Sequence, residues 1–231
     1  MAVAKLYDLA GAQADRRFSP YCWRTRLALA HKGLAVETIP WRFAEKDAIA
    51  RSGQGKVPVL VEGDAWIADS WKIAEYLEAT YPERPSLFGG GAGRALSWFY
   101  STYGDSLVAK VFGLVVMDVF EHLDEGDKAY FRTSREARVG MTLEEFAAGR
   151  DARAPALREH LTPLRQVLAD QPFLGGDAPL YADYAVFGPF QWARCISPYP
   201  VLDPGDPVAA WRDRILDAFG GLARNTPAYA A

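Results

Sequence analysis

The sequence predicts two domains, an α/β domain at the N-terminus and an all-helical domain after it. Residues 1–82 alternate short runs of period-two hydrophobicity with helical patterns, which is typical of strands and helices that build one layered domain. Residues 83–93 are rich in proline and glycine, and beyond them apolar residues recur at helical spacing. We therefore predict an α/β domain over 1–82, a linker over 83–93 and a helical domain over 94–231.

The first strand and the first helix are expected to meet near Ser19. A β-like run over 5–9 precedes a polar loop, after which Ser19 has N-cap chemistry and Pro20 suits the first helical position. Gly33 fits the end of this helix. The serine hydroxyl should lie beside free backbone N–H groups, which attract anions such as thiolates. Ser19 could equally serve only as an N-cap, the commoner role of a serine at such a position.

Three further strands are predicted in the first domain. Residues 36–41 alternate as one strand, while 57–61 and 65–68 flank the turn sequence Glu62-Gly63-Asp64, a good hairpin signal. Pro58 falls inside an apolar strand, where it removes a hydrogen-bond donor from the sheet. A cis Val57–Pro58 bond at the start of the strand resolves this conflict, and we predict one.

A helix follows the hairpin. Asp69 and Ser70 supply cap chemistry for it, apolar residues over 71–81 repeat on one face, and Pro82 stops it. Asp69 would also interact favourably with the positive end of the helix dipole.

The second domain is predicted from apolar residues at helical spacing. These include Leu96, Tyr100, Tyr103, Leu107, Leu157, Leu161, Leu164, Leu168, Val208, Trp211, Ile215 and Phe219. Residues 142–145 match a capping box that opens a short helix in the middle of this domain. Residues 124–127, Asp-Glu-Gly-Asp, are expected to form a polar loop that breaks the helical run only weakly.

Composition limits the classes of function. The net charge of −3 over 231 residues provides no basic field for nucleic acid, and the two cysteines, Cys22 and Cys195, make no metal-type pair. The apolar run 108–119 is short and contains Lys110 and Asp118, so it is expected to be a buried helix and not a membrane span. No signal sequence is recognisable at the N-terminus. We expect a cytoplasmic protein with no metal site, no nucleic-acid partner and no membrane partner.

The sequence Ser19-Pro20-Tyr21-Cys22 resembles the Cys-Pro-Tyr-Cys active site of glutaredoxins, with serine in place of the nucleophilic cysteine. A serine there cannot attack a disulfide, but it can donate a hydrogen bond to the thiolate of a bound molecule. We therefore interpret the motif as a site that activates a bound thiol. Cys22 is interpreted as a buried helix residue without a catalytic role.

The whole chain resembles the cytosolic glutathione S-transferase family. Three motifs carry the resemblance: Ser19-Pro20-Tyr21 at a helix start, Lys56-Val57-Pro58-Val59-Leu60 at a strand, and Asp69-Ser70. The resemblance implies a thioredoxin-like β-α-β-α-β-β-α domain, with a short helix within 42–56, followed by a helical-bundle domain.

Glutathione as co-substrate and a set of contacts to it are also implied by the resemblance. Ser19 would be catalytic, and the backbone at Val57 and Pro58 would meet the cysteinyl moiety of glutathione. Asp69 and Ser70 would hold the γ-glutamyl end. Lys56 could meet the glycyl carboxylate, although it could also be an ordinary loop lysine, and Gln54 is a further binding candidate beside it.

Longer stretches resemble the bacterial glutathione-dependent β-etherases and the related fungal Ser-type transferases. They are Leu6 to Leu9, Ser19 to Gly33, Asp69 to Tyr76, Phe173 to Asp177 and Ala182 to Tyr184. The sequence departs from this subgroup in two places. It ends soon after Pro227, and Leu180 stands three residues before Asp183, where the family's helix-capping box has a polar residue.

Aromatic residues are candidates for an apolar pocket that holds a second substrate. The candidates are Tyr21, Trp41, Trp98, Phe99, Tyr103 and Trp192, although aromatic residues at helical spacing are more often core residues. A set of arginines, namely Arg132, Arg135, Arg138, Arg150 and Arg153, is interleaved with acidic residues and is interpreted as a solvated face.

The favoured function is a glutathione S-transferase whose bound thiolate attacks a small hydrophobic electrophile, with β-aryl ether cleavage as the reaction implied by the subgroup. Two alternatives stay open: a glutathione-dependent reductase that uses Cys22, and a non-catalytic carrier of glutathione and apolar ligands. The resemblance also implies a two-fold homodimer, in which residues 71–81 and 94–122 are the expected interface.

Overall fold

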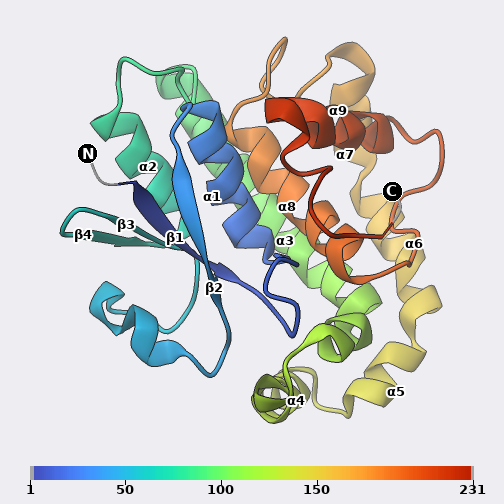
Figure 1. Ribbon diagram of the computed structural model, residues 1–231. Coiled ribbons are helices and arrows are strands. Elements are labelled where there is room, and N and C mark those ends of the chain that lie inside the picture. The colour runs from blue at the N-terminus through green and yellow to red at the C-terminus, as the bar shows by residue number, and fades with distance from the viewer. Residues whose placement is uncertain (1–2, 230–231) are drawn as a thin grey trace.

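The computed structural model describes residues 3–229 and shows an α/β domain joined to a helical domain (Figure 1). The strands of the first domain are β1 (Ala4–Leu9), β2 (Val36–Trp41), β3 (Val59–Glu62) and β4 (Ala65–Ala68). They form one mixed sheet in the order β2-β1-β3-β4, in which β2 runs parallel to β1 and the other pairs are antiparallel. The predicted hairpin between β3 and β4 is confirmed.

The helices of the first domain begin at the predicted caps. Helix α1 (Pro20–His31) is capped by Ser19, and α2 (Ser70–Thr80) is capped by Asp69. Both helices pack together against the sheet (Figure 1). The short helix expected within 42–56 is a 3₁₀ helix, η1 (Lys46–Ser52), so the thioredoxin-like order of elements is present.

The sheet register brings three chain segments together at one end of the strands, which is called the sheet edge below. Tyr7 of β1 lies opposite Val59 of β3, which in turn lies opposite Ala68 of β4. The residues that follow β1, precede β3 and follow β4 must therefore lie close together. This edge collects Pro58 and Asp69, which are far apart in sequence.

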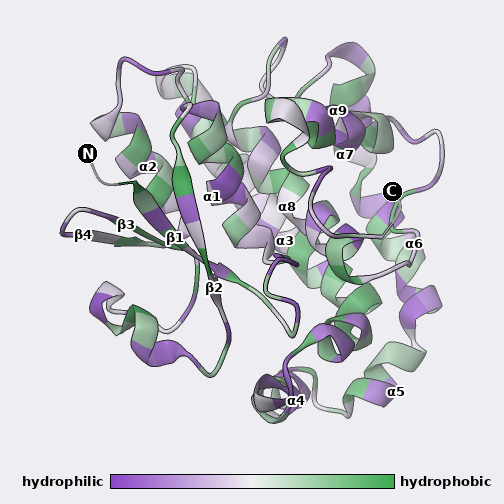
Figure 2. Cartoon of the chain, in the orientation of Figure 1, coloured by the Kyte–Doolittle hydropathy of each residue, from purple (hydrophilic) through white to green (hydrophobic). Residues whose placement is uncertain are grey.

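The second domain is helical, as predicted. Its helices are α3 (Gly91–His122), α4 (Glu125–Val139), α5 (Leu143–Ala148), α6 (Arg150–His160), α7 (Thr162–Asp170), α8 (Tyr181–Ile196) and α9 (Pro207–Gly221). Hydrophilic residues extend along much of α4 (Figure 2). The predicted capping box at Thr142 and Glu145 opens α5.

The prediction of a polar loop at 124–127 is wrong in part. Asp124 is the N-cap of α4, and residues 125–127 form the first turn of the helix instead of a loop. Asp and Glu are favourable in a first helical turn because they complement the helix dipole, so an acidic segment can begin a helix as readily as it can interrupt one.

Helix α8 is the centre of the molecule. All of its residues except Arg194 are buried, and it packs against both α1 and α3. A Cβ at Gly188 of α8 would lie 2.4 Å from the carbonyl oxygen of Pro20, and a Cβ at Gly104 of α3 would lie 2.5 Å from that of Ala185. Only glycine permits such close approach, so these two positions set how near α1 and α3 lie to α8.

The N-terminus of α8 is held by hydrogen bonds to Asp183, although the residue at its N-cap, Leu180, has an apolar side chain. The buried carboxylate of Asp183 accepts hydrogen bonds from the backbone N–H groups of Leu174, Gly175 and Leu180, and from Nε1 of Trp211. Burial raises the pKa of Asp183, and these donors oppose the rise. The missing polar cap is thus compensated by one carboxylate that joins the loop before α8 to α9.

No helix within 3–229 is both long and apolar enough to cross a membrane. Over the same residues, no group of three or more histidine, cysteine and acidic side chains is arranged to hold a metal ion.

Candidate active site

Ser19 caps helix α1 and also carries a hydroxyl proton that it can donate. Its Oγ accepts a hydrogen bond from the backbone N–H of Cys22 at 3.2 Å, which is the N-cap interaction predicted for α1. The cap uses a lone pair of the oxygen, so the hydroxyl can still donate its proton, either to the neighbouring thiol of Cys22 or to the sulfur of a bound ligand. Helical geometry also leaves the N–H of Tyr21 without an acceptor inside the helix. This helix end can therefore stabilise a negative charge.

The Val57–Pro58 peptide bond is cis, as predicted. It lies at the sheet edge described above, where the carbonyl oxygen of Pro58 accepts a hydrogen bond from the N–H of Asp69 at 3.3 Å. Val57 stands just before β3 and outside the pairing of the sheet. Its backbone groups are consequently in a position to bind a ligand.

Asp69 has an unusual backbone conformation, with φ 81° and ψ 132°. A positive φ is strained for a residue other than glycine, and such strain persists only where surrounding contacts impose it. Oδ1 of Asp69 accepts hydrogen bonds from the N–H groups of Trp71 and Lys72, which caps α2. The side chain is exposed, whereas the neighbouring Ser70 is buried. The carboxylate of Asp69 thus reaches solvent at the same edge as Pro58.

A cavity of about 360 Å³ lies between the two domains. One wall comes from the first domain and the other from α3, α4 and α8. The lining residues are Leu9, Phe18, Ser19, Pro20, Tyr21, Trp41, Phe43, Gly55, Lys56, Val57, Asp105, Val108, Ala109, Phe112, Val119, Tyr130, Phe131, Arg135, Arg138 and Trp192.

The structure brings together only part of the predicted set of site residues. Those that line the cavity are Ser19, Tyr21, Trp41, Lys56, Val57 and Trp192. Four others lie outside the lining, namely Gln54, Pro58, Asp69 and Ser70. Of these, Pro58 directly follows Val57 in the chain and is hydrogen-bonded to Asp69. Pro58, Asp69 and Ser70 therefore belong to the sheet edge that borders the cavity, whereas Gln54 lies in the loop between η1 and β3.

Three aromatic candidates on α3 lie outside the cavity lining. Trp98 and Phe99 are 51% and 60% exposed, and the ring centroid of Trp98 lies 4.8 Å from that of Trp71 on α2. Tyr103 stacks on the ring of His160, with centroids 4.9 Å apart, and donates a hydrogen bond to its carbonyl oxygen. Phe99 and Tyr103 occupy faces of α3 other than the one that carries Asp105, Val108 and Phe112, whereas Trp98 shares that face but lies about two turns nearer the N-terminus of the helix.

Helix α4 supplies four lining residues that were not predicted as site residues. Tyr130, Phe131, Arg135 and Arg138 of this helix line the cavity. The helix is held in place by Asp127, whose buried carboxylate accepts hydrogen bonds from the N–H groups of Phe43 at 2.9 Å and Ala44 at 2.8 Å. Its acidic first turn is the only sequence signal for this role.

The charges that line the cavity are mainly positive. Lys56, Arg135 and Arg138 contribute cations, and Asp105 contributes a carboxylate. That carboxylate is paired with the buried Arg24 of α1 at 2.8 Å. Burial and the nearby Asp105 raise the pKa of Tyr21, whereas Arg24 and Arg138 oppose the rise. The cavity therefore favours a ligand with negative charge.

Cys22 lies behind Ser19 and is fully buried. Burial, with a further contribution from the nearby carboxylate of Asp8, raises the pKa of its thiol well above the usual value. A buried thiol with a raised pKa is a poor nucleophile, because the thiolate is the reactive form. This environment argues against the reductase alternative.

Comparison with known families identifies both domains. Residues 18–80 match the model of the glutathione S-transferase N-terminal domain, and residues 95–201 match that of the C-terminal domain. A curated relative, glutathione S-transferase 1 of Dianthus caryophyllus, is 28% identical over 205 residues, which cover 80% of this chain and 91% of that protein.

Solved structures of fungal transferases share the fold. The glutathione transferase GSTFuA3 of Phanerochaete chrysosporium has a TM-score of 0.83 and 26% identity, covering 93% of this chain and 96% of that one. CsGST63524 of Ceriporiopsis subvermispora, solved in complex with glutathione, has a TM-score of 0.81 and 23% identity, covering 94% and 96%. Matched in both of its domains and alike in fold, the chain belongs to the glutathione S-transferase family, which uses glutathione as co-substrate.

Proposed function

We propose that this protein binds glutathione along the sheet edge, activates its thiol at Ser19 and transfers the sulfur to a small aromatic electrophile in the interdomain cavity. The observation that carries the proposal is the position of Ser19. Ser19, whose hydroxyl can act as a hydrogen-bond donor, lines a cavity that is also lined by Val57 and a set of aromatic side chains.

We propose the following contacts for glutathione. The exposed carboxylate of Asp69 binds the γ-glutamyl ammonium, and the hydroxyl of Ser70 binds the adjacent carboxylate. The backbone of Val57, beside Pro58, pairs with the cysteinyl moiety, as a sheet edge pairs with a strand. Lys56, in the cavity lining, binds the glycyl carboxylate. Gln54 lies close enough in sequence to assist Lys56.

Ser19 acts on the reactivity of the sulfur. A free thiol has a pKa near 8.5, and lowering it by about two units stabilises the thiolate by roughly 2.7 kcal/mol. A hydroxyl donor and a helix N-terminus together supply a stabilisation of that order. The thiol proton leaves to solvent, the thiolate forms a new S–C bond, and the leaving group departs with the electron pair of the bond that breaks.

The finer proposal is that the electrophile is an α-carbonyl carbon bearing an aryloxy group. Support comes from the stretches that resemble β-etherases and from the aromatic lining, in which Trp41, Phe43, Phe112 and Phe131 can hold an aryl ring. Phenolate is a tolerable leaving group, so the substitution needs no further cofactor.

Binding and turnover experiments test the proposal separately. Calorimetric titration with glutathione should give a saturable isotherm, and a panel of β-aryl ether, chloronitrobenzene and peroxide substrates should show glutathione-dependent turnover of an aromatic member. Absence of glutathione binding would refute the proposal altogether. Binding without turnover across the panel would support the carrier alternative instead.

We further propose a two-fold homodimer that works in the cytoplasm. Leu96, Trp98 and Phe99 are large apolar side chains that stand exposed on α3 beside α2, as an interface would require. The two cysteines are buried and free, which suits a reducing compartment. Sedimentation at micromolar concentration should give twice the monomer mass, and a single species at the monomer mass would contradict the dimer.

A further inference from the structure

Two arginines of α4 project onto the aromatic wall of the cavity. The guanidinium carbon of Arg135 lies 4.7 Å from the ring centroid of Phe131 and 5.6 Å from that of Phe43. That of Arg138 lies 5.3 Å from the ring centroid of Phe112. All these residues line the cavity. The planar cations therefore lie beside the rings that would hold the body of an aromatic ligand.

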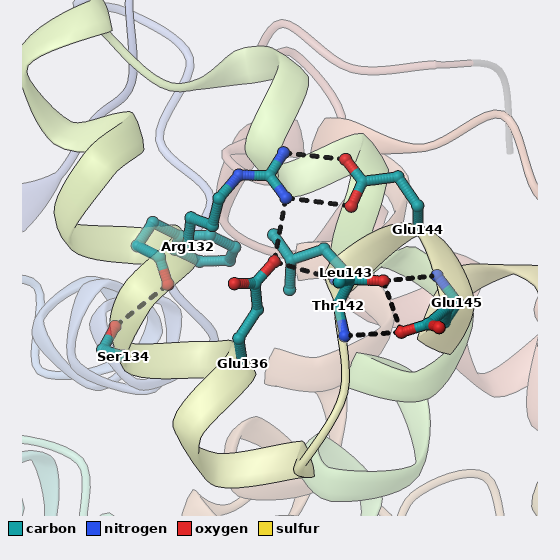
Figure 3. A network of polar contacts seen from close by, with 8 residues as sticks. Arg132, Ser134, Glu136, Thr142, Leu143, Glu144 and Glu145 are labelled. Atoms are coloured by element: carbon teal, nitrogen blue, oxygen red, sulfur yellow. Dashed lines mark hydrogen bonds and ion pairs between the residues drawn. The ribbon is translucent and has the colours of Figure 1, made fainter.

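Neither arginine forms an ion pair with a carboxylate within residues 3–229. The acidic residues near α4 are engaged elsewhere, because Arg132 pairs with Glu136 at 2.8 Å and with Glu144 at 2.7 Å (Figure 3). Asp105, the carboxylate in the cavity lining, is held by Arg24. The positive charges of Arg135 and Arg138 are thus left without compensation inside a half-enclosed site.

The two charges also disfavour each other. Burial lowers the pKa of Arg135, the nearby Tyr130 opposes this fall, and the neighbouring Arg138 lowers the pKa further. An anion placed between them would relieve this repulsion and would supply the planar, two-pronged acceptor that guanidinium groups bind best. Lys56 does not compete for this anion in the proposed complex, since it faces the glycyl carboxylate of glutathione.

We propose that the second substrate is an aromatic acid, whose carboxylate or sulfonate group is bound by Arg135 and Arg138 while its ring packs against Phe43, Phe112 and Phe131. This inference rests on the proposed function, because it concerns the electrophile that glutathione attacks. Arg138 and Tyr21 both line the cavity, and Tyr21 is two residues from Ser19. An acid held by these arginines therefore keeps its ring within the same cavity as the sulfur.

A pair of fluorescent probes tests the inference without turnover. 8-Anilino-1-naphthalenesulfonate and N-phenyl-1-naphthylamine share one aromatic skeleton and differ by the sulfonate group, and both increase in fluorescence when they bind in apolar sites. The intact protein should bind the sulfonate at least about tenfold more tightly than the neutral amine, as expected for charge-assisted hydrogen bonds at a partly exposed site.

Substitutions assign the preference to the two arginines. Arg135→Gln and Arg138→Gln should each weaken sulfonate binding about tenfold and change amine binding less than twofold, whereas Arg135→Lys, which keeps the charge but loses the planar two-pronged donor, should retain only part of the preference. Arg132→Gln, on the same helix but paired with Glu136 and Glu144, is the matched control and should change neither affinity. Equal affinities for the two probes, or equal losses in all three glutamine variants, would overturn the inference.

A second experiment joins the inference to catalysis. With glutathione, 4-chloro-3,5-dinitrobenzoate should be turned over with a higher kcat/KM than its carboxamide, and Arg138→Gln should abolish the difference mainly through KM. Intact glutathione binding together with equal kcat/KM for both substrates would refute the acid preference and leave the proposed function standing. Loss of glutathione binding would refute the proposed function, while the probe experiment would still decide whether the cavity prefers anions.

Discussion

The two walls of the cavity are built by different means. The first-domain wall presents a helix cap and backbone groups, Ser19 at α1 and Val57 at the cis bond, and Asp69 at the cap of α2 lies at the sheet edge that borders this wall. The opposite wall presents long side chains from separate helices, above all Arg135 and Arg138 of α4. Backbone groups are held by secondary structure and suit a constant ligand such as glutathione. Side chains change with single substitutions, and they suit a ligand that differs between relatives.

The largest effect is expected at Ser19. Replacing Ser19 by alanine should lower kcat with an aromatic substrate by about a hundredfold, since a preorganised donor to the reacting atom is lost, with little change in the affinity for glutathione. Because the cap is lost too, α1 should become less stable by about 1 kcal/mol. Steady-state kinetics and thermal unfolding measure the two effects.

Ser19→Thr is the matched control for that variant, since it restores both the cap and the hydroxyl. It should recover most of the rate. A Thr variant as slow as the Ala variant would show that the hydroxyl is not the active group, and the account of the first wall would fail.

The next effect concerns the contact between the domains. Gly188→Ala should destabilise the protein by about 2 kcal/mol, because the added methyl group meets the Pro20 carbonyl and forces α1 away from α8. Since Pro20 adjoins Ser19, activity should fall as well. Urea denaturation provides the free energy of unfolding. An unchanged midpoint would mean that the two domains tolerate a shift, and that the walls are less tightly joined than the geometry indicates.

A smaller effect is expected at Asp69. Asp69→Asn removes the charge, yet asparagine retains the capping oxygen and tolerates a positive φ. The Kd for glutathione should rise about tenfold, as one charge-assisted hydrogen bond is weakened, while kcat stays within twofold. Calorimetry and kinetics measure these quantities. A fall in kcat at unchanged Kd would reverse the roles assigned to Asp69 and Ser19.

The smallest effect is expected at Cys22. The native protein, incubated with oxidised glutathione at neutral pH, should show no mixed disulfide by mass spectrometry, because burial raises the pKa of this thiol. Unfolding the protein in denaturant before the incubation provides the control and should expose both cysteines. A stable adduct on Cys22 in the native state would revive the reductase alternative.

The first wall was predictable because local rules determine it. Ser19 before Pro20, the proline at Pro58 inside an apolar strand, and Asp69 before a helical pattern each have one favourable solution within a few residues. The sheet register then brings these segments together at one edge. Caps and turns follow from short-range chemistry, and for this reason most of the first-domain half of the site could be predicted from the sequence.

The second wall was predicted poorly because tertiary packing determines it. Trp98, Phe99 and Tyr103 were proposed because they are aromatic, but the sequence does not reveal which residues along α3 reach the cavity. Arg135 and Arg138 were interpreted as part of a solvated face, since the sequence cannot show that nearby acids pair with Arg132 instead. Side chains that meet across distant helices leave no local pattern to find.

The hydrogen bonds from Phe43 and Ala44 to Asp127 bear on how such a cavity could change over evolutionary time. They attach the beginning of α4 to the chain segment after β2, so one end of the helix is fixed while residues one to three turns further on line the cavity. Positions 130, 131, 135 and 138 can therefore mutate, and new substrates can be explored, without the spacing between the walls being lost. Asp127 would be the residue that such diversification leaves alone.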